Sequence, residues 1–396
     1  MQNKKVLIIT NMIYPDSPDG SRYTYDLAKI FSKNQYAIAI VTSRFRKELK
    51  RKEVIDNITI YRYYVKTGVP IITYLTNMLF SFFTIRRIVK IINPSLVVIT
   101  GILPGFSYLF FLRNSKHRIN ISICNTLLHS EQLSNQSKQK WLQYRLYNYI
   151  KKVYESFVFD RVSKIIAISR NIENAILDNY PFTKGKLAVV EPGVDINTFV
   201  IGNKKLLREK MYPNKKVFLF VGRFQQIKGP DIAIDFALEM KKNYNFNNFI
   251  LLMLGFGPLE NELKQKISEN KLGDVVNLLG VKHGSELVQL YQRADFLISS
   301  SRSETFSLVV LEALACGTPV ISTPTEGPKE ILAELAEHFV AKGFTGKDLF
   351  DVAKGFINYD DNLYNELSKK CRLIVENKFS LDYMFKKIIS EFPSGI

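Results

Sequence analysis

A repeated alternation of short apolar runs with helix-like segments most constrains the fold of this 396-residue chain. The apolar runs are continuous, which indicates strands buried on both faces, as in a parallel sheet covered by helices. The first half predicts strands at Val6–Thr10, Ala37–Thr42, Leu96–Thr100, Ile119–Cys124, Lys164–Ile168 and Leu187–Glu191. The second half predicts strands at Val217–Val221, Phe249–Leu254, Val275–Leu279, Phe296–Ser299 and Pro319–Ser322. Each half is therefore predicted to be a doubly wound α/β domain.

The chain is too long for one ordinary domain and fits two. The alternating pattern breaks between Glu191 and Lys215, in a stretch that ends in a polar, lysine-rich segment. We predict a first domain of residues 1–200, a second domain of residues 201–378 and a terminal segment of residues 379–396. Helices are expected in the first half and in the terminal segment, at Ser21–Ser32, 70–92, 137–158, Asn171–Asn179 and Leu381–Glu391.

The net charge of +18 is unevenly placed. Residues 1–200 hold 29 Lys and Arg against 13 Asp and Glu, a net charge of +16, whereas the second half has a net charge of +2. This asymmetry favours an anionic partner for the first half: a membrane surface, a lipid-linked substrate or nucleic acid. The alternative is that the charge serves solubility alone. No nucleic-acid recognition motif is present, so no nucleic-acid partner is expected.

The apolar run Val69–Ile85 is followed by Arg86, Arg87 and Lys90. It is slightly short for a membrane span and is interrupted by polar residues, so a core-facing or interfacial helix is predicted. An ordinary amphipathic helix of the domain is the alternative. The three cysteines form no CxxC pair, which favours a reducing compartment, and the strand-like start of the chain does not resemble a signal peptide.

Two loops of the second half have the composition of a phosphate site. Gly222 follows a strand, and Arg223 and Lys228 flank a loop that leads into a helix, an arrangement suited to a diphosphate. Gly255 and Gly257 follow the next strand and permit close backbone approach to a ligand. The alternatives are solvated cations and a plain tight turn. In the loop after the third strand, the backbone at Val281 could read a base edge, or the loop could be an ordinary one.

Two glutamates eight positions apart, Glu304 and Glu312, follow in the same half. The run Phe306–Cys316 is predicted to be a buried helix, so Glu312 inside it needs polar partners. With a rise of about 1.5 Å per residue, eight positions span roughly 12 Å, which suits the two ends of an elongated polar ligand. A surface position for Glu312 is the alternative.

The first half offers two further candidates. Gly20 lies in the loop between the first strand and the first helix, where α/β domains bind ligands. His129 follows a predicted buried strand and is either a substrate contact or a structural histidine. No cluster of His, Cys or Asp has the spacing of metal ligands, so no metal or other cofactor is expected.

Taken in order, these motifs resemble glycosyltransferase family 4, whose members are retaining, nucleotide-sugar-dependent enzymes of GT-B fold. The resemblance covers nearly the whole chain. It implies two Rossmann-like domains facing a cleft, with the terminal helix crossing back onto the first domain. It also implies a hexosyltransferase that needs no metal. Together with the basic first half of the chain, it leads us to expect a location on the cytoplasmic side, peripheral on the inner face of the cell membrane.

The resemblance also implies a role for each motif residue. Arg223 and Lys228 would hold the diphosphate, Glu304 would hold the donor sugar, and His129 and Gly20 would close over it. The remaining donor-site residues would be Gly222, Gly255, Gly257, Val281, Phe306, Ser307, Leu308 and the ribose-binding Glu312. The donor would be a UDP- or GDP-sugar, and the acceptor a lipid-linked glycan or another cell-surface polysaccharide precursor.

The chain departs from the family at Thr305 and Ser307, where many members carry glycine, so the donor sugar is harder to infer. The loop at Gly20 also lacks a second glycine. Two alternatives stay open: a GT-B nucleotide-sugar epimerase, and a partner subunit that keeps the fold without catalysis.

Overall fold

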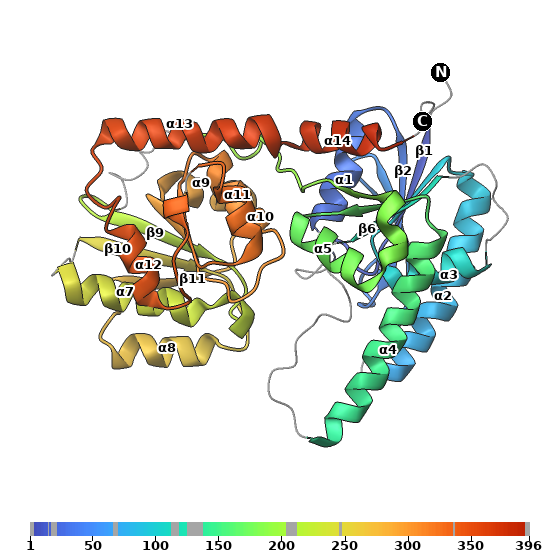
Figure 1. The fold of residues 1–396 in the computed structure, drawn as a ribbon, viewed down its shortest axis with the longest axis horizontal. Helices are drawn as coiled ribbons and strands as arrows, with labels where there is room; N and C mark the ends of the chain where they lie inside the picture. Colours follow the sequence, from blue (N-terminus) through green and yellow to red (C-terminus); the bar gives the residue numbers. More distant parts are fainter. Residues whose placement is uncertain are drawn as a thin grey trace. The chain divides into compact units, whose positions relative to one another are not determined.

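The computed structural model describes residues 4–14, 16, 22–65, 70–111, 119–124, 138–202, 212–244, 248–335 and 337–392 (Figure 1). The chain divides into two compact units. The first comprises Met1–Glu191 and Met384–Ile396, and the second comprises Pro192–Tyr383. Among the described residues, no helix combines the length and the apolar character needed to cross a membrane.

The first unit is built on an eight-stranded sheet of order β3-β4-β2-β1-β5-β6-β7-β8. Its strands are β1 (Lys5–Ile9), β2 (Ala37–Arg44), β3 (Lys52–Ile55), β4 (Ile58–Tyr64), β5 (Leu96–Ile99), β6 (Ile119–Cys124), β7 (Lys164–Ala167) and β8 (Leu187–Val189). Every pairing is parallel except that of β3 with β4. Val6, Leu7, Ile8 and Ile9 of the central strand are fully buried, as the continuous apolar pattern predicts.

The β3–β4 hairpin was not predicted from the sequence. Its two strands are joined by Asp56 and Asn57, which both have positive φ angles (50° and 61°). Two consecutive left-handed residues are the mark of a type I′ turn, whose twist matches that of the flanking strands. The pair Asp56-Asn57 was therefore an available hairpin signal in the sequence.

Helices pack on this sheet and on one another. They are α1 (Arg22–Lys33), α2 (Pro70–Ile92), α3 (Ile102–Phe111), α4 (Lys138–Arg161) and α5 (Arg170–Asn179), with the short η2 (Pro181–Lys186) before β8. Helix α3, which was not predicted, packs against both α2 and α4. Asp16 lies in the loop after β1, and its buried carboxylate accepts bonds from Arg62 Nε and Nη2 at 2.6 and 2.7 Å. This ion pair anchors that loop to β4.

The second unit contains a five-stranded, fully parallel sheet of order β11-β10-β9-β12-β13. Its strands are β9 (Lys216–Val221), β10 (Phe249–Leu254), β11 (Val276–Gly280), β12 (Phe296–Ser299) and β13 (Val320–Ser322). Its helices are α7 (Pro230–Tyr244), α8 (Glu260–Glu269), α9 (Gly284–Arg293), α10 (Leu308–Ala315), α11 (Glu326–Leu332), α12 (Gly346–Ala353) and α13 (Asp361–Lys378), with the short helices η3 (Gln226–Lys228) and η4 (Glu337–Phe339). Two parallel-sheet units confirm the predicted doubly wound α/β class.

The order of strands in each sheet fixes where a ligand can approach. In the second sheet the chain adds β10 and β11 on one side of β9 and then β12 and β13 on the other. The chain therefore leaves the adjacent strands β9 and β12 in opposite directions, and the loops after these two strands lie together at the carboxyl edge of the sheet, the usual ligand position in open α/β sheets. The same reversal occurs in the first sheet, between β1 and β5.

The last helix, α14 (Leu381–Ser390), begins in the second unit and joins the first from Met384 onward. Within the first unit the Phe385 ring contacts Phe31 of α1 edge-on, with centroids 5.1 Å apart. Lys387 Nζ donates to Glu191 Oε2 at 2.8 Å, and Lys164 Nζ donates to Glu391 Oε2 at 2.9 Å. An aromatic contact and two ion pairs thus attach the end of the chain to the first unit.

Substituting Phe385→Ala is expected to destabilise the first unit by about 2 kcal/mol, because a half-buried ring and its edge-on contact are lost. Urea denaturation measures the loss of stability. Hydrogen exchange of the native variant should be faster in α1 than in the wild type. The matched control is Lys386→Ala on the exposed side of the same helix, which should have little effect. Unchanged exchange in α1 with Phe385→Ala would contradict this role of α14.

Candidate functional site

The candidate site lies at the carboxyl edge of the second sheet, where the loops after β9 and β12 meet. The loop after β9 carries Arg223 and Lys228, and the loop after β12 carries Glu304. Lys228 Nζ donates to Glu304 Oε2, and Ser301 Oγ donates to the same oxygen at 3.4 Å. Both partners are only partly exposed. Two residues predicted from separate motifs are therefore brought into direct contact at the switch point of the sheet.

A second ion pair, between Arg302 and Asp231, holds these two loops together. Arg302 Nη1 donates to Asp231 Oδ1 at 2.8 Å and to the carbonyl of Gln226 at 2.7 Å, and Nη2 binds Asp231 Oδ2. The Arg302 amide donates to the carbonyl of Ile227 at 2.8 Å. The guanidinium fork thus ties the backbone that carries Lys228 to the loop that carries Glu304. The sequence analysis did not identify Arg302 or Asp231 as site residues.

The pKa shifts of Asp231 and Arg302 are consistent with the geometry of this ion pair, which we call the clamp. Burial alone would raise the pKa of the Asp231 carboxyl, but the hydrogen bonds and charge of Arg302 outweigh burial and lower that pKa below its ordinary value. The same bonds raise the pKa of Arg302. Since the folded protein binds the Asp231 proton more weakly than the unfolded chain does, the pair stabilises the fold above the unfolded pKa. Its contribution is lost as the pH falls through the folded pKa.

The glycines of the predicted phosphate loops are required by contacts between loops. A Cβ on Gly255, which has φ of +151°, would lie 1.8 Å from the carbonyl oxygen of Gly222. A Cβ on Gly229, with φ of +59°, would lie 2.0 Å from the carbonyl oxygen of Ser300. Gly257 lies against the backbone of Phe224, whose amide donates to the carbonyl of Phe256 at 2.8 Å. At Gly255 and Gly257 the structure therefore shows close contacts with the backbone of another loop of the protein. A contact of these two glycines with a ligand stays a prediction.

Glu312 lies inside α10 and is 4% exposed. Its Oε2 accepts a hydrogen bond from the buried Tyr291 hydroxyl at 2.8 Å, which meets the expected need for a polar partner. Burial, reinforced by this nearby carboxylate, raises the pKa of the Cys316 thiol to about 12, so the thiol is protonated at neutral pH. The structure rules out a surface position for Glu312, and its contact with a ribose stays a prediction.

The helix that carries Glu312 begins later than predicted. Helix α10 begins at Leu308 and not at Phe306, so the chain from Glu304 to Ser307 is a loop, and the 12 Å estimate, which applied a helical rise to all eight positions, does not apply. Phe306 is buried, and its ring packs against the ring of Phe379 with the two centroids 6.0 Å apart. Ser307 caps the helix with φ of +93° and ψ of +89°, a conformation that favours glycine. The first amides of α10 have no partner within the helix itself.

The remaining predicted site residues are distributed as follows. Gly222 and Arg223 follow β9 directly, and Arg223 is half-buried. Val281 follows β11 and is exposed. Gly20 and His129 lie outside the described residues, so their predicted closing role is not addressed by this structure. No group of three or more His, Cys, Asp and Glu side chains is placed to hold a metal ion in the part of the chain that the structure describes.

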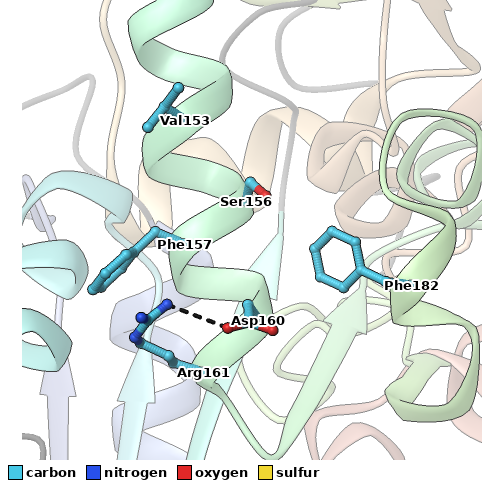
Figure 2. Close-up of a pocket in the computed structure, with 6 residues that line it drawn as sticks. All are labelled: Val153, Ser156, Phe157, Asp160, Arg161 and Phe182. Atoms are coloured by element: carbon cyan, nitrogen blue, oxygen red, sulfur yellow. Dashed lines mark hydrogen bonds and ion pairs between the residues drawn. The ribbon is translucent and has the colours of Figure 1, made fainter.

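A hollow of about 340 Å³ lies elsewhere, in the first unit between α4 and η2. Val153, Ser156, Phe157, Asp160 and Arg161 line it from α4, and Phe182 lines it from η2 (Figure 2). Arg161 pairs with its neighbour Asp160 at 3.2 Å and lies over the Phe157 ring at 3.7 Å. The two charged residues that line this hollow, Asp160 and Arg161, are thus paired with each other. It contains none of the predicted site residues.

Two family models match the chain in succession. "Glycosyltransferase Family 4" matches residues 20–198, and "Glycosyl transferases group 1" matches residues 204–373. D-inositol 3-phosphate glycosyltransferase 2 of Catenulispora acidiphila is 29% identical over 214 residues, which are 52% of this chain and 50% of that protein. The chain spans about half the length of the curated relatives it matches.

Solved structures match over the whole chain. Sucrose-phosphate synthase from Thermosynechococcus elongatus superposes with a TM-score of 0.80 at 18% identity, and Anabaena HepE, solved with UDP and glucose, with a TM-score of 0.74 at 18% identity. Each match covers 98% of both chains. The two parallel-sheet units and these likenesses define an α/β protein of GT-B fold, as predicted. Together with the two successive family matches, they show that the chain belongs to the family 4 type of GT-B glycosyltransferases.

Substituting Arg302→Lys or Asp231→Asn is expected to lower the free energy of unfolding by about 1–3 kcal/mol, since a lysine cannot bridge both carboxylate oxygens and a carbonyl. Urea denaturation at pH 7 measures the loss. The exposed i,i+4 pair of Lys264 and Glu260 provides the control, and Lys264→Gln should cost little. The difference between wild type and Asp231→Asn should shrink below about pH 4. A difference that persists at low pH would contradict the assigned clamp.

Substituting Ser307→Gly is expected to raise the free energy of unfolding by about 1 kcal/mol, because glycine adopts φ of +93° without steric cost. Ser307→Ala keeps a Cβ and should give no such gain, and Ser307→Val should destabilise the protein, because a β-branched residue is strained at positive φ. Chemical denaturation of the three variants measures these differences. A stabilising valine would show that the backbone at this position is not left-handed.

Proposed function

We propose that the protein transfers a hexose from a UDP- or GDP-sugar to a lipid-linked glycan or another cell-surface polysaccharide precursor, with retention of the anomeric configuration. The observation that carries the proposal is the contact of Lys228 with Glu304 at the switch point of the second sheet. An ammonium and a carboxylate held side by side can bind adjacent parts of one ligand, a phosphate and a sugar hydroxyl.

The chemistry of transfer requires stabilisation of the leaving group. The bond between the anomeric carbon and the diphosphate oxygen breaks, the acceptor oxygen bonds to that carbon, and the acceptor hydroxyl releases its proton to the solvent. Negative charge therefore grows on the diphosphate, and cations fixed beside it lower the barrier. Lys228 has three N–H donors, so it can keep Glu304 and still donate to a phosphate. Arg223, on the same loop, supplies the second cation.

In this proposal no metal is needed, because the two cations do the work that a divalent ion does in other transferases. Glu304 holds the donor sugar, and Glu312, supported by Tyr291, accepts from the ribose. Gly222, Gly255, Gly257, Val281 and the amides of Phe306, Ser307 and Leu308 complete the donor site.

Two similarities support the choice of substrates. HepE, which shares the fold, was solved with UDP and glucose, and the relatives matched by sequence are named for an acceptor that is a phosphorylated polyol. An anionic acceptor fits the strongly basic first half of the chain. The same charge supports a location on the cytoplasmic side, peripheral on the inner face of the cell membrane.

Substituting Lys228→Ala or Glu304→Gln is expected to reduce turnover of the donor about 10²–10³-fold, because each removes a group that contacts the reacting part of the donor. The rate of nucleotide release from a panel of UDP- and GDP-sugars measures this, with and without EDTA. The controls are Lys264→Ala and Glu262→Gln on α8, outside the site.

The outcomes of this assay separate the proposal from its rivals. Conversion of a UDP-sugar into its epimer without acceptor would identify an epimerase, and the absence of turnover with every donor would favour a non-catalytic subunit. Unchanged turnover with Glu304→Gln would remove Glu304 from the site. Loss of activity in EDTA, restored by Mg²⁺, would overturn the metal-independent mechanism.

A further inference from the structure

Helix α2 shows an inverted polarity in its central turns. The polar residues Asn77 and Ser81 are buried, whereas Leu79 and Phe83 are 52% and 58% exposed. Phe80, which neighbours Phe83 on the helix surface at the i,i+3 spacing, is 38% exposed. A helix that served only to cover the sheet would turn its leucine and phenylalanines inward, because burial of large apolar side chains stabilises the fold.

Contacts on the inner side hold α2 in this orientation. The Tyr63 hydroxyl of β4 donates to Asn77 Oδ1 at 3.2 Å, and Ser107 Oγ of α3 donates to the carbonyl of Met78 at 3.2 Å. Ile85 and Ile88, further along the inner face, are fully or almost fully buried. The outward direction of the apolar side chains is therefore fixed by the fold.

Basic residues continue the same exposed face toward the end of the helix. Positions 79, 83, 86 and 90 are four, three and four residues apart, so Leu79, Phe83, Arg86 and Lys90 lie along one face. Arg87 lies beside them, and all three cations are exposed. With a rise of about 1.5 Å per residue, the centre of the basic part lies roughly 10 Å along the axis from the centre of the apolar part. In Figure 1, α2 is one of the long helices of the first unit.

We propose that this face of α2, defined by Leu79, Phe80, Phe83, Arg86, Arg87 and Lys90, is the surface by which the protein docks on an anionic lipid bilayer. Interfacial helices bury apolar side chains about 5–10 Å into the headgroup region while Lys and Arg pair with lipid phosphates. The net charge of +16 in residues 1–200 favours an anionic bilayer over a neutral one. The inference rests on the proposed function, whose lipid-linked acceptor lies in such a bilayer.

Flotation with phosphatidylcholine vesicles, with or without phosphatidylglycerol, tests the inference on the full chain. Wild type should bind the anionic vesicles, and binding should weaken with salt. Arg86→Gln/Arg87→Gln/Lys90→Gln should weaken anionic binding about 100-fold, since each charge near the surface counts for about fivefold. Leu79→Ser/Phe80→Ser/Phe83→Ser should weaken binding at all salt concentrations.

Matched controls are taken from α13, which carries exposed residues of the same kinds. Leu363→Ser/Leu373→Ser removes exposed apolar side chains, and Lys369→Gln/Lys370→Gln removes exposed cations. Both controls should bind vesicles as wild type does. Thermal unfolding of every variant verifies that the fold is retained, and a more conservative variant, Phe83→Leu, should keep most of the binding.

Three results would overturn the inference: wild-type binding by both α2 variants, equal binding to neutral vesicles, or loss of a dimer in gel filtration with the apolar variant, which would identify a second copy of the chain as the occupant.

Nucleotide release from the donor in solution distinguishes the two proposals. If vesicle binding depends on α2 while wild type releases no nucleotide, the docking surface stands and the proposed function fails. If nucleotide release proceeds and the α2 variants still bind vesicles as wild type does, the reverse holds.

Discussion

The guanidinium of Arg302 joins the two loops on which the candidate site depends. It donates to the carboxylate of Asp231 and to the carbonyl of Gln226. The backbone amide of Arg302 donates to the carbonyl of the next residue, Ile227. Lys228 follows directly, and Glu304 lies two residues beyond Arg302. A long lysine side chain holds one position only when its backbone is held, because free rotamers cost entropy to restrict. The contact between Lys228 and Glu304 thus depends on the Arg302–Asp231 pair, which holds the backbone of both loops.

Much of the architecture could be predicted because continuous apolar runs have one common explanation, a strand covered on both faces. The hairpin of β3 and β4 was missed because β3, with the sequence Lys-Glu-Val-Ile, is an edge strand with no continuous apolar run. Helix α3 was missed because its apolar sequence and internal proline do not show helical periodicity. In both cases neighbouring elements stabilise a segment that is ambiguous by itself.

The candidate site was predictable in part for similar reasons. Lys228 and Glu304 stood out because motifs surround them. Arg302 and Asp231 did not, since charged loop residues are usually solvated and their pairing is visible only in three dimensions. The backbone angle of Ser307 could not be inferred either, although the family comparison drew attention to that position. Gly255 was identified for a close approach to a ligand, which stays a prediction, and its close contact with the Gly222 backbone could not be inferred from the sequence.

The two units offer different kinds of surface. The second unit presents a polar edge whose charged groups are held in fixed positions, as recognition of a diphosphate requires. The first unit presents a helix whose exposed face is apolar and then basic, as contact with a fluid bilayer requires. Under the two proposals, the charge concentrated in the first half serves the bilayer, and the motifs of the second half serve the donor.

A crystal structure of the protein with bound UDP tests the central claim most directly. The account predicts that the diphosphate lies at the carboxyl edge of β9 and β12, within hydrogen-bond distance of Lys228 Nζ and Arg223, and that the Arg302–Asp231 pair is unchanged. A nucleotide bound away from this edge, or held with Lys228 pointing away from the phosphates, would contradict it.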